Sequence, residues 1–78
     1  MKPIVTEKAV LAIERDNTLT FRTEMKKTKN DIAKEVAELF NVKVQKIRTS
    51  TRNNKKTAFV KLKKEFPAID VATKLGLI

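Results

Sequence analysis

The absence of cysteine and histidine from this 78-residue chain constrains its fold more than any other feature. A chain of this length buries only about 60% of the surface that its unfolded form exposes, so modest stability is expected. Without cysteine it can form neither disulfide bridges nor thiolate metal sites to compensate. The fold must therefore rest on one hydrophobic core. Hydrophobic residues make up 41% of the composition, which suffices for a single domain over residues 1–78.

The same residue types argue against catalysis. A chain without histidine lacks the commonest general base near neutral pH. Glu35 and Glu38 could pair, but they lie beside Lys34 on a helix side that we expect to face solvent. The single glycine excludes a glycine-rich phosphate loop. We therefore predict that the protein is not an enzyme, holds no cofactor or metal, and takes no small-molecule substrate.

The apolar pattern also indicates in which cellular compartment the protein works. No apolar run approaches the length that a membrane helix needs, and no basic, apolar and small-residue sequence typical of a signal peptide opens the chain. We expect no membrane insertion. Because the chain also lacks cysteine, we expect it to work in the cytoplasm.

Helical and strand periodicities alternate along the first part of the chain. A helix is predicted after Thr6, a plausible N-cap followed by Glu7 in the first turn. A half-buried strand is predicted over Thr18–Thr23, with Leu19 and Phe21 inward. The helix side chains expected to face the core are Val5, Ala9, Ala12 and Ile13.

A second helix is the clearest local prediction. Thr28 and Asp31 have the spacing of a capping box, and Asn41 ends the helical pattern. The residues between them form one apolar face. Its members are Ile32, Ala33, Val36, Leu39 and Phe40.

The remaining residues predict a hairpin and a short helix. Val42–Arg52 is rich in β-branched residues, and its apolar phase slips between Val44 and Ile47, which predicts either a strand that begins near Gln45 or a bulge. After a turn at residues 53–56, Thr57–Lys63 returns as the second strand, and Ala68–Leu75 forms a helix. The predicted fold is α+β, a small three-stranded, mainly antiparallel sheet with helices packed on it. Ala58, Val60 and Leu62 should point into the core.

The positive charge is concentrated in that hairpin. The formal net charge is +9, and residues 41–64 carry nine basic side chains and no acid. Residues 1–40, by contrast, are almost neutral, with eight basic and seven acidic side chains. A solvated surface would explain an ordinary basic run, but this density favours a polyanionic partner.

Nucleic acid is the polyanion that these residue types fit best. Cations on adjacent strands can meet successive phosphates, and the hydroxyl and amide side chains nearby suit phosphate, sugar or 2′-hydroxyl groups. With so few aromatic residues, contacts to the shape and backbone of folded RNA are favoured over base stacking on an aromatic sheet. The candidates from this region are Lys43, Lys46, Arg48, Thr49, Arg52, Asn53, Asn54, Lys55, Lys56 and Lys61.

Phe59 admits two interpretations. It is the one aromatic residue that we place on the cationic face of the hairpin. It either packs under the C-terminal helix, which we favour, or stacks on an unpaired base. Phe21, Phe40 and Phe66 are predicted core residues by their phase.

Several segments match the motifs of one known family. The opening residues 2–9, Lys-Pro-Ile-Val-Thr-Glu-Lys-Ala, are similar to the family's first motif. The similarity continues through Asn17–Phe21, through residues 28–44, where Thr28-Lys29 begins the second helix, and through Lys55–Leu62. It covers essentially the whole chain in order. Each motif is moderately specific alone, and together they make the chain resemble the family of the large ribosomal subunit protein twenty-three.

The resemblance implies a role in the ribosome. Members bind large-subunit ribosomal RNA beside the polypeptide tunnel exit, next to neighbouring large-subunit proteins. They also help to dock factors that meet nascent chains, such as the signal recognition particle. By position, Glu7 matches the acid implicated in docking, although it also suits the first turn of a helix. Lys8 of the same motif is a further candidate for RNA contact.

Two departures from the family limit this transfer. Only Asn53–Lys56 connects the last two strands, which resembles the short archaeal form rather than the long bacterial extension. Arg48 stands where members often carry asparagine, so an asparagine-specific contact is not expected. The alternative function is a free architectural protein that coats DNA or RNA without a fixed site.

Overall fold

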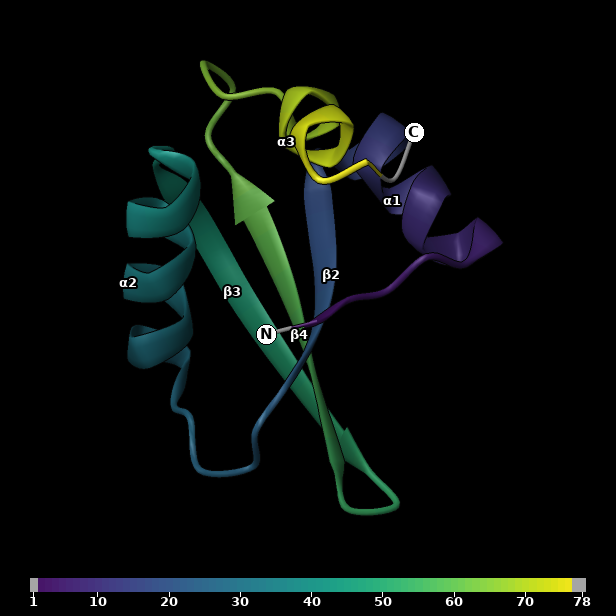
Figure 1. The fold of residues 1–78 in the computed structure, drawn as a ribbon, viewed down its shortest axis with the longest axis vertical. Coiled ribbons are helices and arrows are strands. Elements are labelled where there is room, and N and C mark those ends of the chain that lie inside the picture. Colours follow the sequence, from purple (N-terminus) through teal and green to yellow (C-terminus); the bar gives the residue numbers. More distant parts are fainter. Residues whose placement is uncertain (1, 77–78) are drawn as a thin grey trace.

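The computed structural model describes residues 2–76 and shows three helices on a four-stranded antiparallel sheet (Figure 1). The α+β prediction is confirmed. The strands lie in the order β1-β2-β4-β3. The elements are β1 (Lys2–Pro3), α1 (Glu7–Asp16), β2 (Thr18–Thr23), α2 (Lys29–Phe40), β3 (Val44–Arg52), β4 (Lys55–Leu62) and α3 (Ala68–Lys74).

The prediction of three strands misses β1. Lys2 pairs with Arg22 and Pro3 with Phe21, and the Ile4 backbone N–H donates to the Thr20 carbonyl oxygen (3.0 Å). A strand of two residues is too short to show alternation. The periodicity of the sequence therefore could not predict this strand.

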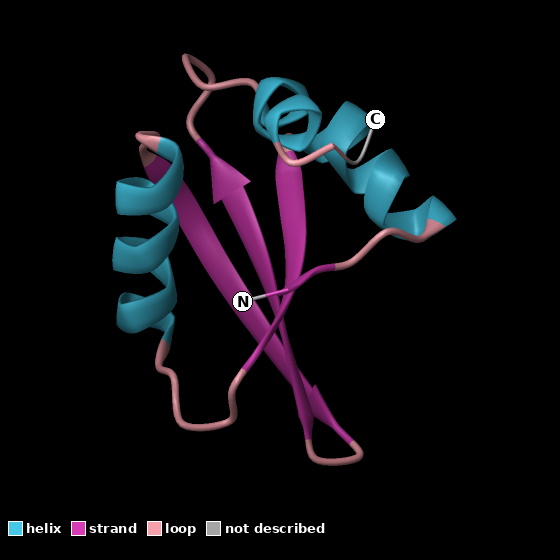
Figure 2. Ribbon diagram, in the orientation of Figure 1, coloured by secondary structure: helices cyan, strands magenta, loops and turns pink. Residues whose placement is uncertain are grey.

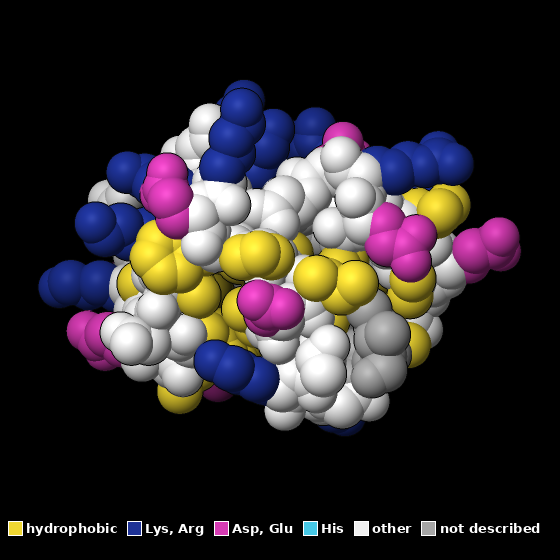
Figure 3. Space-filling model, turned by 90° about the horizontal axis from the view of Figure 1, so that it is seen from above, with side chains coloured by type: hydrophobic (Ala, Val, Ile, Leu, Met, Phe, Trp, Pro, Cys, Tyr) yellow, Lys and Arg dark blue, Asp and Glu magenta, His cyan; other side chains and the backbone are white. Residues whose placement is uncertain are grey.

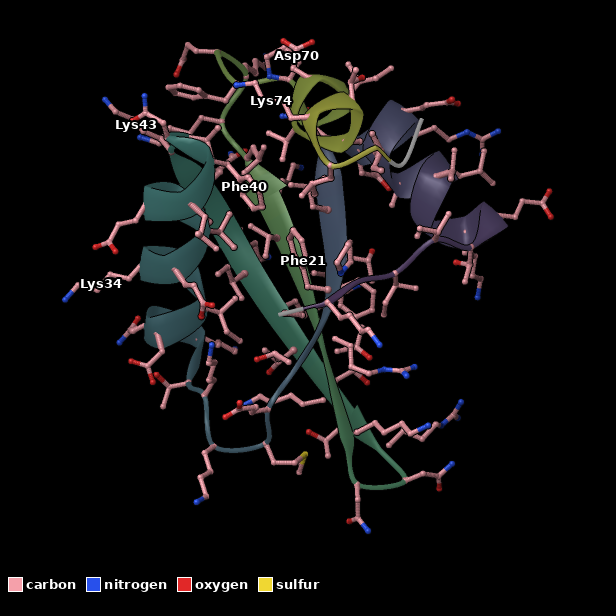
Figure 4. All side chains as sticks on the ribbon, in the orientation of Figure 1. Phe21, Lys34, Phe40, Lys43, Asp70 and Lys74 are labelled. Atoms are coloured by element: carbon pink, nitrogen blue, oxygen red, sulfur yellow. The ribbon has the colours of Figure 1, made fainter. Side chains whose placement is uncertain are left out.

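The core lies on the face of the sheet that α2 and α3 cover, and it also includes Ile13 of α1. Figure 2 shows the arrangement of these helices around the sheet. Ile32 and Val36 of α2 and Ala68 of α3 are fully buried. The predicted inward residues of β2 and β4 are all buried, and Phe66 packs against this cluster half-buried. The rings of Phe21 and Phe40 stack with centroids 6.1 Å apart and planes 12° from parallel, between α2 and the sheet (Figure 4). No helix within residues 2–76 is long and apolar enough to cross a membrane.

Two residues predicted on apolar stripes are exposed instead. Leu39 is 64% exposed because α2 is rotated so that Phe40, rather than Leu39, covers Phe21. Val5 is 60% exposed because it lies before α1, in the segment that leads from β1 to the N-cap. The stripe was correct for Ala9 and Ile13, which are both buried.

Side-chain caps begin both long helices. The Ala9 backbone N–H donates to Thr6 Oγ1 (3.1 Å), which confirms the predicted N-cap of α1. The capping box of α2 is confirmed as well: the Asp31 N–H donates to Thr28 Oγ1, and the Thr28 N–H donates to Asp31 Oδ2, each at 3.2 Å. The hydrogen bond from the Thr28 backbone, supported by the Thr28 side chain, lowers the pKa of the Asp31 carboxyl.

Asn17 links the C-terminal end of α1 to the segment between β4 and α3. It caps α1 in the left-handed conformation (φ 50°). Its Nδ2 donates to the carbonyl oxygens of Leu62 (3.1 Å), Lys63 (3.3 Å) and Phe66 (3.2 Å), and its Oδ1 accepts from the Ala68 N–H (2.5 Å). One side chain thus fixes the path from β4 into α3.

The hairpin has the predicted bulge and a tighter turn than expected. The register between β3 and β4 shifts between Val44 and Lys46. The strands continue to the Arg52–Lys55 pair, so the connection is only Asn53-Asn54. Both asparagines have positive φ (52° and 60°), as a type I′ turn requires. This turn lets β3 and β4 twist together as one ribbon (Figure 1).

Candidate nucleic-acid interface

The sheet face opposite the core carries most of the cations of the hairpin. Successive residues of a strand point to opposite faces, so the register identifies which side chains share this second face. Arg48, Phe59 and Thr20 lie side by side on β3, β4 and β2. We call this surface the open face. Its members are Thr18, Thr20 and Arg22 of β2, Thr57, Phe59 and Lys61 of β4, and Lys46, Arg48, Ser50 and Arg52 of β3.

A groove runs between α1 and the open face. Its α1 wall includes Ala9, Ala12 and Asp16, and its floor includes Phe59 and Thr20. Four of the side chains that line it are basic and only one is acidic. Such a balance suits an anionic ligand. The basic residues are Lys8, Lys46, Arg48 and Lys61.

Phe59 lies in this groove rather than in the core. It is half-buried, and the Cζ of Arg48 lies 5.3 Å from the centroid of its ring, within cation–π range. Phe59 is absent from the residues that pack against the core cluster, whereas its neighbours Ala58 and Val60 belong to that cluster. The favoured prediction, that Phe59 packs under the C-terminal helix, is therefore wrong. The strand alternation that buries Ala58 and Val60 turns Phe59 away from α3.

A smaller hollow extends the basic surface toward the hairpin turn. It is lined by Arg22, Arg52 and Lys55, together with hydroxyl side chains of the two strands and Asn53. Phe59 lines both hollows, so they are adjacent. Arg52, Asn53, Asn54 and Lys55 are all exposed here. The open face thus carries basic side chains from the groove to the tip of the hairpin.

Three of the predicted contact residues lie elsewhere. Thr49 shares the core side of β3 with Ile47 and is half-buried. Lys56 also points to that side, where its Nζ donates to the Lys27 carbonyl oxygen. Lys43 lies just after α2, at the same end of the molecule as the last turn of that helix (Figure 4). One flat RNA surface could not contact these three residues and the open face together.

Sequence reasoning missed the contribution of β2. Arg22 and the hydroxyls of Thr18 and Thr20 line the two hollows, yet the expected interface included only the hairpin and Lys8. The alternation within Thr18–Thr23 already placed these three residues on one side. The pairing of β2 with β4, which brings that side beside Phe59, was the information that was lacking.

Acidic side chains are concentrated away from the open face. Glu35 of α2 forms an ion pair with Lys27, and this contact raises the pKa of the Lys27 ammonium group. Glu7 is exposed in the first turn of α1. Figure 3 looks down on the end that carries α3 and the last turn of α2, where apolar side chains fill the middle and charged side chains of both signs surround them. The ten residues of the open face, by contrast, include no acidic side chain.

Known proteins resemble this chain over nearly its whole length. Residues 1–71 match the family described as Ribosomal protein L23. The "Large ribosomal subunit protein uL23" of Methanothermobacter thermautotrophicus is 45% identical over 78 residues, which cover 99% of this chain and 91% of that protein. The protein of the same name from Dictyostelium discoideum is 46% identical over 77 residues, which cover 97% of this chain. The chain spans about half the length of the Dictyostelium protein (46%).

Proposed function

The chain belongs to the ribosomal protein L23 family, and on that premise we propose that its open face binds large-subunit ribosomal RNA. Family members are structural proteins of the large ribosomal subunit, and the chain is not an enzyme. The main support for this RNA-binding surface is the groove, which is lined by four basic side chains and only one acidic side chain. The ribosome in the cytoplasm is then where the protein works.

The open face, rather than the whole predicted set, is the main contact surface in this proposal. Lys46, Arg48 and Lys61 on the sheet contact phosphates, with Lys8 at the groove rim. Arg52, Asn53 and Lys55 extend the contact to the hairpin tip, where Asn54 also lies. Lys43, Thr49 and Lys56 would take part only where RNA also reaches a second side of the molecule.

We further propose that the protein lies at the polypeptide tunnel exit. This proposal rests on the family resemblance together with the exposure of Glu7 in the first turn of α1. There, a nascent-chain factor such as the signal recognition particle would dock on Glu7. Reversal of this charge in Glu7→Lys should weaken factor binding to ribosomes and leave RNA binding unchanged. Equal factor affinity of mutant and wild-type ribosomes would contradict the docking role.

Neighbouring large-subunit proteins are the other proposed partners. Apolar side chains remain accessible on the helices that cover the core: Leu39 of α2 is 64% exposed and Ile69 of α3 is 43% exposed. A protein neighbour would bury such side chains, whereas RNA would occupy the oppositely placed basic face. The two faces of the sheet would then serve two kinds of partner.

Sedimentation of the tagged protein from a cell lysate tests the ribosomal role. The protein should migrate with large subunits and stay there through a high-salt wash, because an integrated site combines many contacts. A free architectural protein would instead spread over all nucleic acid and wash off, since its binding depends on counterion release alone. That result would contradict the proposal.

A further inference from the structure

We infer that the groove between α1 and the open face holds one unpaired nucleobase of RNA, stacked on the Arg48–Phe59 pair. This inference rests on the proposed RNA binding and adds a specific site to it. It starts from an unusual feature of the open face: among its members, Phe59 is the single large apolar side chain, surrounded by cations and hydroxyls.

The geometry of the pair suits stacking. Phe59 is half-buried in the groove floor and Arg48 is exposed above it, with Cζ 5.3 Å from the ring centroid. A guanidinium plane and an aromatic ring both stack on bases, and stacking tolerates any base because each has a π-face. The pair therefore offers a base a preformed surface.

The rest of the groove matches the remaining parts of a nucleotide. Ala9 and Ala12 give the α1 wall an apolar lining, which suits the flat face or edge of a base. Thr18, Thr20 and Thr57 provide hydroxyls for ribose or base edges, and Lys46 and Lys61 stand where the flanking phosphates would lie. A helical duplex covers the faces of its bases, so the occupant must be a base extruded from a loop or bulge.

Binding to two matched RNAs tests the site. One is a short single-stranded RNA, and the other has the same backbone with its central bases removed. The wild-type protein should bind the RNA with bases about tenfold more tightly, as expected for one stacked base. In Phe59→Leu this preference should fall to less than about twofold, while the affinity for the abasic RNA stays unchanged.

Three further variants separate stacking from charge and from folding. Arg48→Lys keeps the charge but removes the plane, so it should also reduce the preference for bases. Lys61→Gln should weaken the binding of both RNAs equally. Phe66→Leu makes the same side-chain change at a half-buried phenylalanine that packs against the core, and it should keep the preference. If 2-aminopurine replaces a base of the RNA, the wild-type protein should quench its fluorescence, and the Phe59→Leu variant should not.

The outcomes distinguish this inference from the function on which it rests. Equal binding of both RNAs by the wild-type protein, or an unchanged preference in Phe59→Leu, would overturn the nucleobase site. If large-subunit rRNA still binds in that case, the proposed function survives. Failure of the folded wild-type protein to bind large-subunit rRNA or either test RNA would overturn both.

Discussion

The two faces of one sheet use the same strands for opposite purposes, and Phe21 and Phe59 show the contrast most clearly. They lie on adjacent strands: Phe21 pairs with Ala58, and Phe59 pairs with Thr20. Phe21 is buried and stacked on Phe40, whereas Phe59 lies in a basic groove under Arg48. A shift of one residue in the alternation thus separates a side chain that stabilises the fold from one available for binding.

Truncation of each phenylalanine should produce the largest difference between the two faces. Phe21→Ala should destabilise the protein by about 3–5 kcal/mol, because it removes a buried ring and leaves a cavity. Phe59→Ala should cost less than about 1 kcal/mol, since it removes surface packing and one cation–π contact. Urea unfolding followed by circular dichroism measures both free energies. Equal losses would mean that the two faces do not differ as described.

The second largest effect is expected at Asn17, whose side chain holds the segment between β4 and α3 in place. Asn17→Ala should cost about 3 kcal/mol, because it removes four hydrogen bonds and leaves partly buried carbonyl groups unpaired. Asn41→Ala is the matched control. Asn41 also caps a helix with positive φ (54°), and its loss should cost only about 1 kcal/mol. Similar destabilisation by both variants would show that the bonds from Asn17 contribute little.

A smaller effect of opposite sign is expected on the open face. Lys46 and Lys61 are directly paired across β3 and β4, and like charges at such positions repel. Lys61→Thr should therefore raise the stability of the free protein by about 0.5 kcal/mol at low salt while it weakens RNA binding. Added salt should erase the gain, because it screens exposed charges. A loss of stability in this variant would contradict the repulsion between Lys46 and Lys61.

The smallest effect concerns the acid sensitivity of α2. The pKa of Asp31 lies below its ordinary value of 3.8, chiefly through the Thr28 backbone N–H. A lowered pKa contributes stability above pH 3.8, and that contribution is lost as the pH falls through the lowered value. Asp31→Asn should thus melt earlier than wild type at neutral pH and approach it in acid. Melting curves across this range check the sign, and parallel curves would contradict it.

Local chemistry explains which parts of the fold could be predicted. The Thr6 cap and the Thr28–Asp31 capping box each depend on neighbouring residues, and both were predicted from the sequence. The register shift between Val44 and Lys46 was one of the two alternatives that the local pattern predicted. Strand β1 could not be predicted because its two residues acquire their structure only by pairing with β2. Similarly, the exposure of Leu39 depends on the rotation of α2 over Phe21, which no local pattern specifies.

The candidate site shows the same division. The concentration of cations in residues 41–64 indicates a polyanion partner, and the sequence alone is enough to select Lys46, Arg48 and Lys61, which line the groove. Which cations share a face depends on register, so Lys56 could not be separated from Lys55 by composition. The contribution of Arg22 needed the pairing between distant strands.

The salt dependence of binding to large-subunit rRNA tests the central claim, that the open face is the RNA surface. The triple variant Lys46→Gln, Arg48→Gln and Lys61→Gln should lower the affinity and reduce the slope of log K against log salt by roughly two to three, because up to three phosphate contacts are lost. The control triple, Lys29→Gln, Lys34→Gln and Lys74→Gln, removes the same charge from exposed positions on α2 and α3 and should leave the slope near wild type. Equal reductions in both triples would mean that net charge, rather than the open face, determines RNA binding.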